Sequence, residues 1–321
     1  MAKYKYEMKP LFEERMRKLL KDGDDFDAFS KISHTKSRKW IRANELKIDS
    51  DKLFQRLNKK WKVVRPFPKY KEIMLIESEL EPGELGNSIE HLLGYYYVQE
   101  ISSMMSVLAL DPRPGEFVLD VAASPGSKTT QIAARMENTG TIIANDVALE
   151  RVKILNTNLE RCGVSNCVIT RNDGVGLCNR LSKKGWKFDK ILLDAPCSGE
   201  GTLRDSPKTF KMWNIKVVNN LGRMQKKMIA SAFKCLKKDG ILVYSTCTHA
   251  PEENESVVSF ALENFPVELI KLNLPLKCRE GIKNWQDDIY DNNVSKSCRI
   301  YPHDNDSEGF FVAKLRLKEE I

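Results

Sequence analysis

From residue 116 onward, short apolar runs alternate with longer amphipathic runs, and this alternation constrains the fold more than any other feature. The short runs are typical of buried strands: FVLDVA (117–122), GTIIAND (140–146), NCVITRND (166–173), FDKILLDAP (188–196), GILVYSTC (240–247) and VELIKLNL (267–274). Connections between parallel strands need about a dozen residues, usually a helix, and the amphipathic runs supply that length. The pattern therefore predicts an α/β domain with a Rossmann-like parallel sheet covered by helices on both faces.

The charge of the chain is concentrated at its N-terminal end. Residues 1–70 contain 20 Lys and Arg against 10 Asp and Glu, whereas residues 71–321 contain 32 against 34. The basic residues alternate with aromatic ones in HTKSRKWIR (34–42) and NKKWKVVRPFPKYK (58–71). A solvated lysine-rich face would give the same composition. Beside a second domain without that bias, nucleic-acid binding is the favoured interpretation.

Two domains are therefore expected: a small basic α/β module that binds nucleic acid, over residues 1–90, and a larger Rossmann-like domain over residues 91–321. No segment is long and apolar enough to cross a membrane, and the first residues do not resemble a signal peptide. We expect a monomeric cytoplasmic protein. The eight cysteines include no CxxC pair, so free thiols and no metal site are predicted.

Polar residues of possible function fall where the predicted strands end. Ligands of open parallel sheets bind beyond the carboxyl ends of the strands. The residues found there are, in chain order, Asp120, Asp146, Asp173, Asp194 with Cys197, and Cys247.

The loop after the first strand, DVAASPGSKTT (120–130), consists of small residues that let the backbone approach a ligand. It does not match the GxGxxG fingerprint or the phosphate-binding P-loop. Asp146, 20 residues beyond Gly126, is at the right distance to bind ribose hydroxyls, although Asp146 and Asp173 could equally cap the helices that follow them. A nucleoside site without phosphate recognition favours S-adenosylmethionine as the cofactor.

Two cysteines at the ends of consecutive strands indicate pyrimidine chemistry. A thiolate that adds to C6 of cytosine makes C5 nucleophilic enough to accept a methyl group, and a carboxyl group beside the ring stabilises the charge that develops at N3. Cys247, Cys197 and Asp194 provide these groups if the fourth and fifth strands are neighbours. A buried cysteine is more often a small apolar core residue, which is the interpretation kept for the other six cysteines.

The segments DVAASPGSKTT, LDAPCSGEGTLR (193–204) and YSTCT (244–248) resemble the Sun-domain family of RNA cytosine-C5 methyltransferases. YYYVQEISSMM (95–105) and RIYPHDNDSEGFF (299–311) resemble further family segments, so the resemblance covers about residues 90–316. It implies that Cys247 attacks C6, Cys197 assists product release, Asp194 contacts the base and Lys128 lies between cofactor and base. The cofactor-binding residues that it implies are Ala122, Ala123, Ser124, Pro125, Gly126, Ser127, Lys128, Asp146, Arg151, Asp173 and Asp194.

The cofactor loop departs from the family pattern, since Ala122 replaces a frequent cysteine, Ser124 an alanine and Ser127 a glycine. All three are small, so altered loop packing is expected rather than lost binding.

tRNA is the favoured substrate, because the chain lacks long charged extensions typical of ribosome-assembly factors. rRNA methylation, uridine-C5 methylation and non-catalytic RNA binding are the alternatives. His249 and His303 are expected to make structural hydrogen bonds rather than to act as acids or bases.

Overall fold

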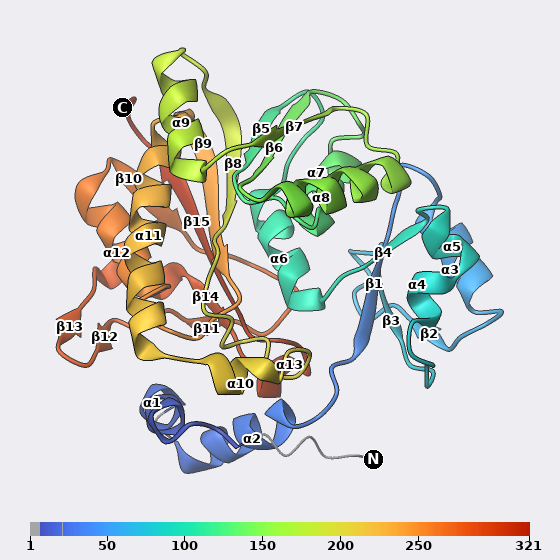
Figure 1. Ribbon diagram of the computed structural model, residues 1–321, viewed down its shortest axis with the longest axis horizontal. Coiled ribbons are helices and arrows are strands. Elements are labelled where there is room, and N and C mark those ends of the chain that lie inside the picture. Colours follow the sequence, from blue (N-terminus) through green and yellow to red (C-terminus); the bar gives the residue numbers. More distant parts are fainter. Residues whose placement is uncertain (1–6, 21) are drawn as a thin grey trace.

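The computed structural model of this chain describes residues 7–20 and 22–321, and a mixed β-sheet forms its centre (Figure 1). The strands of this sheet are β5 (Phe117–Asp120), β6 (Thr141–Asp146), β7 (Cys167–Arg171), β8 (Phe188–Asp194), β9 (Leu236–Thr246), β10 (Val267–Ile270), β11 (Arg279–Glu280), β14 (Cys298–Ile300) and β15 (Phe310–Leu317). They follow the order β11-β14-β15-β9-β8-β5-β6-β7, with β10 also paired to β15. The predicted α/β fold class is confirmed.

The five strands from β5 to β9 pair in parallel, as the alternation of short and long runs predicts. The remaining pairings of the sheet, those of β15 with β9, β14 and β10 and of β11 with β14, are antiparallel. β15 lies inside the sheet, with β9 on one side and β14 and β10 on the other. The sixth predicted strand, β10, is antiparallel because it pairs with the end of β15 rather than with a parallel neighbour.

Helices cover both faces of the sheet. α6 (Ile101–Leu110), α7 (Ser127–Arg135) and α8 (Leu149–Cys162) lie on one face, and α9 (Gly174–Lys183), α11 (Ile215–Phe233) and α12 (Glu255–Asn264) lie on the other (Figure 1). Successive strand residues enter opposite cores, as the period of a strand requires: Ile191 and Leu193 join the core beneath α9 and α11, and Leu192 joins the core beneath α6 and α7. Both faces are apolar because both are buried.

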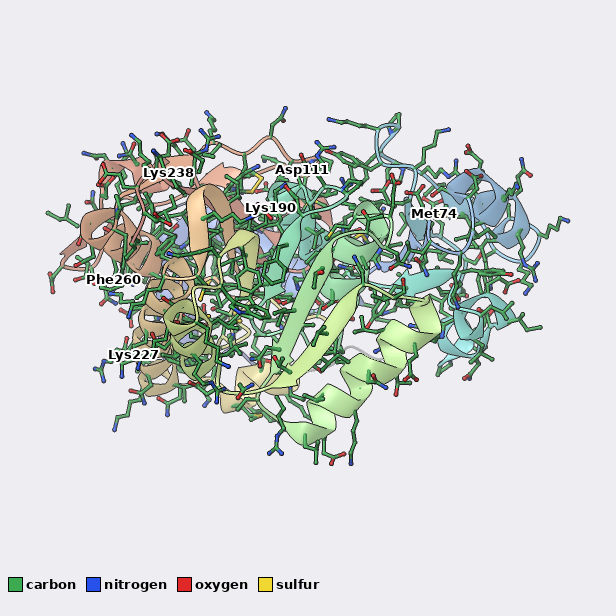
Figure 2. The ribbon with its side chains drawn as sticks, turned by 90° about the horizontal axis from the view of Figure 1, so that it is seen from above. Met74, Asp111, Lys190, Lys227, Lys238 and Phe260 are labelled. Atoms are coloured by element: carbon green, nitrogen blue, oxygen red, sulfur yellow. A yellow bond between two sulfur atoms is a disulfide. The ribbon has the colours of Figure 1, made fainter. Side chains whose placement is uncertain are left out.

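A second, smaller sheet lies beside the first. Its strands are antiparallel and follow the order β2 (Val63–Val64), β3 (Ile73–Ile76), β1 (Lys39–Ala43) and β4 (Tyr96–Val98). The nearby helices are α3 (Ser50–Leu57), α4 (Glu84–Asn87) and α5 (Ile89–Leu92). Leu53 and Leu57 of α3 pack with Met74 in a separate apolar core. Seen from above in Figure 2, Met74 lies to the right of Lys190 in β8, and Phe260 of α12 lies to its left.

A buried arginine ties the small sheet to the catalytic sheet. Arg42 of β1 is 1% exposed, and its guanidinium donates to the carbonyl oxygen of Ser127 at 2.8 Å and to Oγ1 of Thr130 at 2.8 Å. Ser127 and Thr130 lie in the first turn of α7, within the last residues of the predicted cofactor loop. Burying a charge is costly unless the group is hydrogen-bonded, so these bonds hold the small sheet against that loop.

The first two helices, α1 (Pro10–Leu20) and α2 (Gly23–Ser33), pack against helices and turns of the domain that contains the large sheet rather than against the small sheet. The ring of Phe12 contacts that of Trp213 at 5.5 Å between centroids, and Arg15 pairs with Glu252 at 2.8 Å. Figure 1 shows both helices beneath α10 (Lys208–Met212) and α13 (Pro302–Asn305). The small sheet in turn extends to Val98 through β4. A domain boundary at residue 90 stays a prediction.

One cysteine prediction is wrong. Cys278 and Cys298 form a disulfide with their Cα atoms 5.1 Å apart, whereas free thiols were expected throughout. The sequence gives no warning because the two residues are 20 positions apart with no spacing motif, and antiparallel pairing of β11 with β14 brings them together. The other six cysteines are free.

The remaining elements are short: β12 (Asn284–Trp285), β13 (Asp288–Ile289) and a 3-10 helix (Asn292–Lys296). Over the part of the chain that the structure describes, no helix has the length and apolarity needed to span a bilayer.

Candidate active site

The two cysteines singled out in the sequence meet at the carboxyl ends of β8 and β9. These strands are parallel neighbours, as predicted, and Asp194 is opposite Ser245 in their register. Cys197 Sγ lies 3.2 Å from Cys247 Sγ. The loops that carry the thiols are linked to each other, since the backbone N–H of Gly201 donates to the carbonyl of Cys247 at 2.9 Å. Pairing of β8 with β9 thus brings two cysteines that are 50 positions apart in the sequence into direct contact.

Both thiols are only partly buried, which leaves them open to a substrate. The hydrogen bond with Cys247 and burial raise the pKa of the Cys197 thiol well above its usual value. Two thiolates in such close contact would repel each other strongly. The pair therefore retains a proton under conditions in which a single thiolate can form.

An ion pair between Lys128 and Asp194 lies at the carboxyl end of β8. Lys128 Nζ is 2.7 Å from Oδ2 of Asp194 and donates to Oγ of Ser103 at 2.8 Å. The other carboxylate oxygen, Oδ1, accepts from Oγ of Ser245 at 2.7 Å. Lys128 also lies 5.4 Å above the ring of Phe310. The ammonium group balances the carboxylate charge and holds the Asp194 side chain at the carboxyl end of β8, in the region of the thiols.

The predicted cofactor loop connects β5 to α7. Gly126 precedes α7 with φ of 105°, a conformation that favours glycine, and a Cβ there would meet the side chain of Leu155 at 3.0 Å. The backbone N–H of Ser124 donates to Asp146 at 3.3 Å, and its Oγ donates to the carbonyl of Arg151 at 2.8 Å. The hydroxyl of Ser124, which stands where the family has alanine, therefore adds a bond that alanine could not make.

Asp120 is buried directly beneath this loop. Oδ2 accepts from Thr129 Oγ1 at 2.7 Å, while Oδ1 has no hydrogen-bond partner among the described residues. Burial raises the pKa of this carboxyl group to about 7, and the nearby charge of Asp194 adds to the shift. An unpaired buried oxygen beside a loop of small residues and the start of a helix fits a polar ligand such as the amino-acid portion of S-adenosylmethionine.

Asp146 and Arg151, the residues predicted to bind near the ribose, contact each other. Arg151 Nε contacts both carboxylate oxygens of Asp146 at 3.1 Å, and its Nη2 donates to the carbonyl of Ser124 at 2.9 Å. Val147 follows Asp146 with 63% of its surface exposed, and such an apolar surface suits an adenine ring. Sequence reasoning did not select Val147, although an apolar residue directly after a strand-end aspartate is a usable signal.

Asp173 caps α9 and accepts from the backbone N–H of Gly176 at 2.8 Å. This is the capping role that the sequence left open for it, and cofactor contact by Asp173 stays a prediction. Among the predicted residues, Lys128 and Asp194 contact each other directly, as do Cys197 with Cys247 and Asp146 with Arg151.

The two histidines are outside this constellation. His249 is buried and stacked on Tyr301 at 5.0 Å between centroids, and burial lowers its pKa to about 3. His303 Nε2 lies 2.8 Å from Oδ1 of Asp25. Their surroundings are those of packing residues. His303 makes the structural hydrogen bond expected of it, whereas Nε2 of the buried His249 has no partner among the described residues.

Sequence reasoning missed two buried residues behind the thiols. Glu253 accepts from the backbone N–H of Ser198 at 3.1 Å and from Gln225 Nε2 at 2.8 Å. Gln225 also donates to the carbonyl of Pro196 at 2.8 Å. Glu253 lies in the acidic run PEENE (251–255), just before α12 begins at Glu255. Carboxylates in a buried turn after the fifth strand were the available signal.

Comparison with known proteins agrees with this geometry. A family profile described as 16S rRNA methyltransferase RsmB/F matches residues 107–316, and one described as the N-terminal domain of 16S rRNA methyltransferase RsmF matches residues 8–101. The tRNA (cytosine(49)-C(5))-methyltransferase of Pyrococcus abyssi is 41% identical over 98% of this chain and 98% of its own length. Ribosomal RNA small subunit methyltransferase F of Psychromonas ingrahamii is 40% identical, and the match covers 95% of this chain but 62% of that relative.

Solved structures agree as well. A methyltransferase homologue from Pyrococcus horikoshii superposes with a TM-score of 0.83 at 35% identity, covering 96% of this chain and 94% of the other. NSun6 from the same organism, determined with the S-adenosylmethionine analogue SFG, gives a TM-score of 0.82 at 26% identity, covering 96% of this chain and 98% of that one.

Replacement of Asp120 tests its raised pKa. Because the folded protein holds this proton more tightly than the unfolded chain, whose aspartate pKa is about 4, stability falls as the pH rises from about 4 through about 7. Asp120→Asn keeps an acceptor for Thr129 and removes that loss. Without ligand, its free energy of unfolding relative to wild type should rise by roughly 2–4 kcal/mol between pH 4.5 and pH 8.

Urea unfolding at the two pH values measures this difference. Asp173→Asn, at the exposed cap of α9, is the matched control and should show a far smaller change. An equal offset for Asp120→Asn at both pH values would contradict the assignment.

Proposed function

The chain belongs to the RsmB/F family of S-adenosylmethionine-dependent RNA cytosine-C5 methyltransferases, and from that premise we propose that it methylates tRNA through a covalent bond between Cys247 and C6 of the target cytosine. The observation that carries this proposal is the contact of two partly exposed thiols, 3.2 Å apart, beside the ion pair of Asp194 with Lys128. A thiol pair alone could be structural. Beside a carboxylate at a strand end, it supplies the groups that the reaction requires.

The first step uses the thiolate of Cys247. Its sulfur adds to C6, the C5–C6 electron pair moves into the ring toward N3, and the pyrimidine becomes an enamine whose C5 is nucleophilic. Asp194, 2.7 Å from the ammonium of Lys128, accepts a hydrogen bond from the exocyclic amine, and accepts a second from N3 once N3 is protonated as negative charge develops there. A base reaches this position only after it leaves the RNA stack.

The bound S-adenosylmethionine supplies the electrophilic methyl group to C5. The residues proposed to hold it are those of the loop 122–128, with Asp146, Arg151 and Asp173 at the ribose end and Asp194 toward the base. After transfer, a water molecule takes the proton from C5, the C5–H electron pair forms the C5–C6 double bond, and the C6–sulfur bond breaks so that its electron pair returns to the Cys247 sulfur. Cys197, in contact with that sulfur, is proposed to assist this release.

tRNA is preferred to rRNA because the relative named as a tRNA methyltransferase is 41% identical over 98% of this chain and 98% of its own length. The rRNA methyltransferase F relative is 40% identical, and this chain spans 62% of its length. rRNA is the second candidate because the family profile and the N-terminal profile both carry rRNA descriptions. A monomer in the cytoplasm remains the expectation for the assembly and location of this protein.

The substrate proposal is tested by incubating the protein with labelled S-adenosylmethionine and either unmodified tRNA or small-subunit rRNA, followed by mass spectrometry of the nucleosides. We expect 5-methylcytidine in the tRNA. Label in rRNA alone would overturn the tRNA proposal, and 5-methyluridine would overturn the assignment of the base.

The two thiols should fail differently when replaced. Cys247→Ala removes the nucleophile, so turnover should fall by at least about a thousandfold and no covalent complex should form. Cys197→Ala leaves the nucleophile and impairs release, so a protein–RNA complex resistant to denaturant should accumulate on a gel. A shifted band from Cys247→Ala, or none from Cys197→Ala, would argue against this division.

The basic N-terminal residues are proposed to bind RNA phosphates, and one lysine gives a clean test. Within the two basic segments, Arg38 pairs with Asp306, Lys39 lies 3.5 Å from Asp205, and Lys60 pairs with buried Glu90. Replacing any of these three would also remove an ion pair. Lys59 is exposed and forms no ion pair with any residue that the structure describes.

Lys59→Gln should weaken tRNA binding and reduce the slope of log K against log salt by about 1. Lys238→Gln is the matched control, since this exposed lysine lies near the start of β9, at the end of the strand away from Cys247 (Figure 2). Filter binding over a salt series measures both. Equal slopes for Lys59→Gln and wild type would exclude this lysine from the RNA contact.

A further inference from the structure

The turn that carries Cys197 is held from behind by a buried carboxyl group. Glu253 accepts from the backbone N–H of Ser198, the residue directly after the cysteine, and from Gln225 of α11. Gln225 reaches the carbonyl of Pro196, the residue directly before it. Both neighbours of Cys197 are thus fixed through one pair of side chains, and neither side chain contacts the turn carrying Cys247 by a comparable bond.

Glu253 is fully buried and forms no ion pair with any described residue. Its Oε1 has no hydrogen-bond partner within the described part of the chain. Burial raises the pKa of this carboxyl group to about 7, so that it carries substantial charge from neutral pH upward. The titratable groups that face it are Cys197, Glu200 and Tyr244, and no cation is among them.

Contact between the two thiols does not by itself determine which sulfur carries the negative charge and which keeps the proton. Only one of two sulfurs 3.2 Å apart can carry a negative charge without severe repulsion, so the pair shares one proton. If that proton were on Cys247, the nucleophile would be blocked. A buried negative charge behind Cys197 disfavours a second charge there and leaves the thiolate to Cys247.

We propose that Glu253 is a positioning residue that fixes the Cys197 turn and keeps the shared proton on the Cys197 sulfur, so that Cys247 is the thiolate. This inference rests on the proposed function, because it explains which of two adjacent thiols attacks the base. The proton remains on Cys197 Sγ and is donated to Cys247 Sγ as a hydrogen bond. No oxidant, reductant or co-reactant takes part.

Brief alkylation with limiting iodoacetamide, followed by peptide mass spectrometry, tests the proposal because the reagent reacts with thiolates. In the wild-type protein, Cys247 should be alkylated ahead of Cys197, and the Cys197 to Cys247 ratio should fall from pH 6 to pH 8 as Glu253 ionises. Glu253→Gln keeps an acceptor for Ser198 and removes the charge. The ratio in this variant should exceed that of wild type roughly three- to tenfold at pH 8 and little at pH 6.

Glu252→Gln is the matched control. This carboxylate is the preceding residue in the chain, but it pairs with Arg15 and accepts from Trp285 instead of facing the thiols. Its alkylation ratio should equal that of wild type. An unchanged ratio in Glu253→Gln at pH 8, an equal rise at both pH values, or the same rise in the control would each overturn the proposal.

If Glu253→Gln does not fold, the pH dependence in the wild-type protein decides: a Cys197 to Cys247 ratio that does not fall between pH 6 and pH 8 overturns the proposal. The experiment uses neither RNA nor cofactor. Its failure would therefore leave the proposed methylation of tRNA standing, and failure of that methylation would not change the alkylation result.

Discussion

The parallel pairing of β8 with β9 is the constraint on which the rest of the site depends. It places the turn after Asp194 beside the turn after Thr246, and it brings two thiols from distant parts of the chain to 3.2 Å. The register is fixed by burial, since a slip of one residue would move Ile191 and Leu193 to the wrong face of the sheet. The chemistry of the site is therefore secured by apolar packing well below it.

A second constraint is the set of hydrogen bonds that links the small sheet, which is expected to bind RNA, to the cofactor region. Arg42 extends from the small sheet to the first turn of α7, where its buried guanidinium satisfies a carbonyl and a hydroxyl group. Arg161 near the end of α8 donates back to the carbonyl of Tyr96 in β4 at 3.3 Å. The small sheet is thus bonded to the two helices that flank the proposed cofactor site, so a phosphate contact on that sheet would have a fixed distance to the reacting base.

Much of this arrangement was predictable because it follows from local pattern. Apolar runs set the strands, and the rule that ligands bind at carboxyl ends selected Asp120, Asp194, Cys197 and Cys247 without any knowledge of their neighbours. The family resemblance then separated the roles proposed for the two thiols, which the spacing could not do.

The features that were missed depend on tertiary contacts between distant segments. The disulfide of Cys278 with Cys298 requires antiparallel pairing of strands that are only two and three residues long. The position of α1 depends on the contact of Phe12 with Trp213 at the end of α10. Glu253 gains its significance from the amide of Ser198, 55 residues away. None of these leaves a periodic signal in the sequence.

The most direct test of the central claim is to trap the reaction on RNA that contains 5-fluorocytosine, whose C5 cannot lose a proton, and to sequence the peptide attached to the nucleotide. The account predicts a single modified peptide, bonded through the sulfur of Cys247. Attachment through Cys197, or a complex that forms equally well after Cys247→Ala, would contradict it.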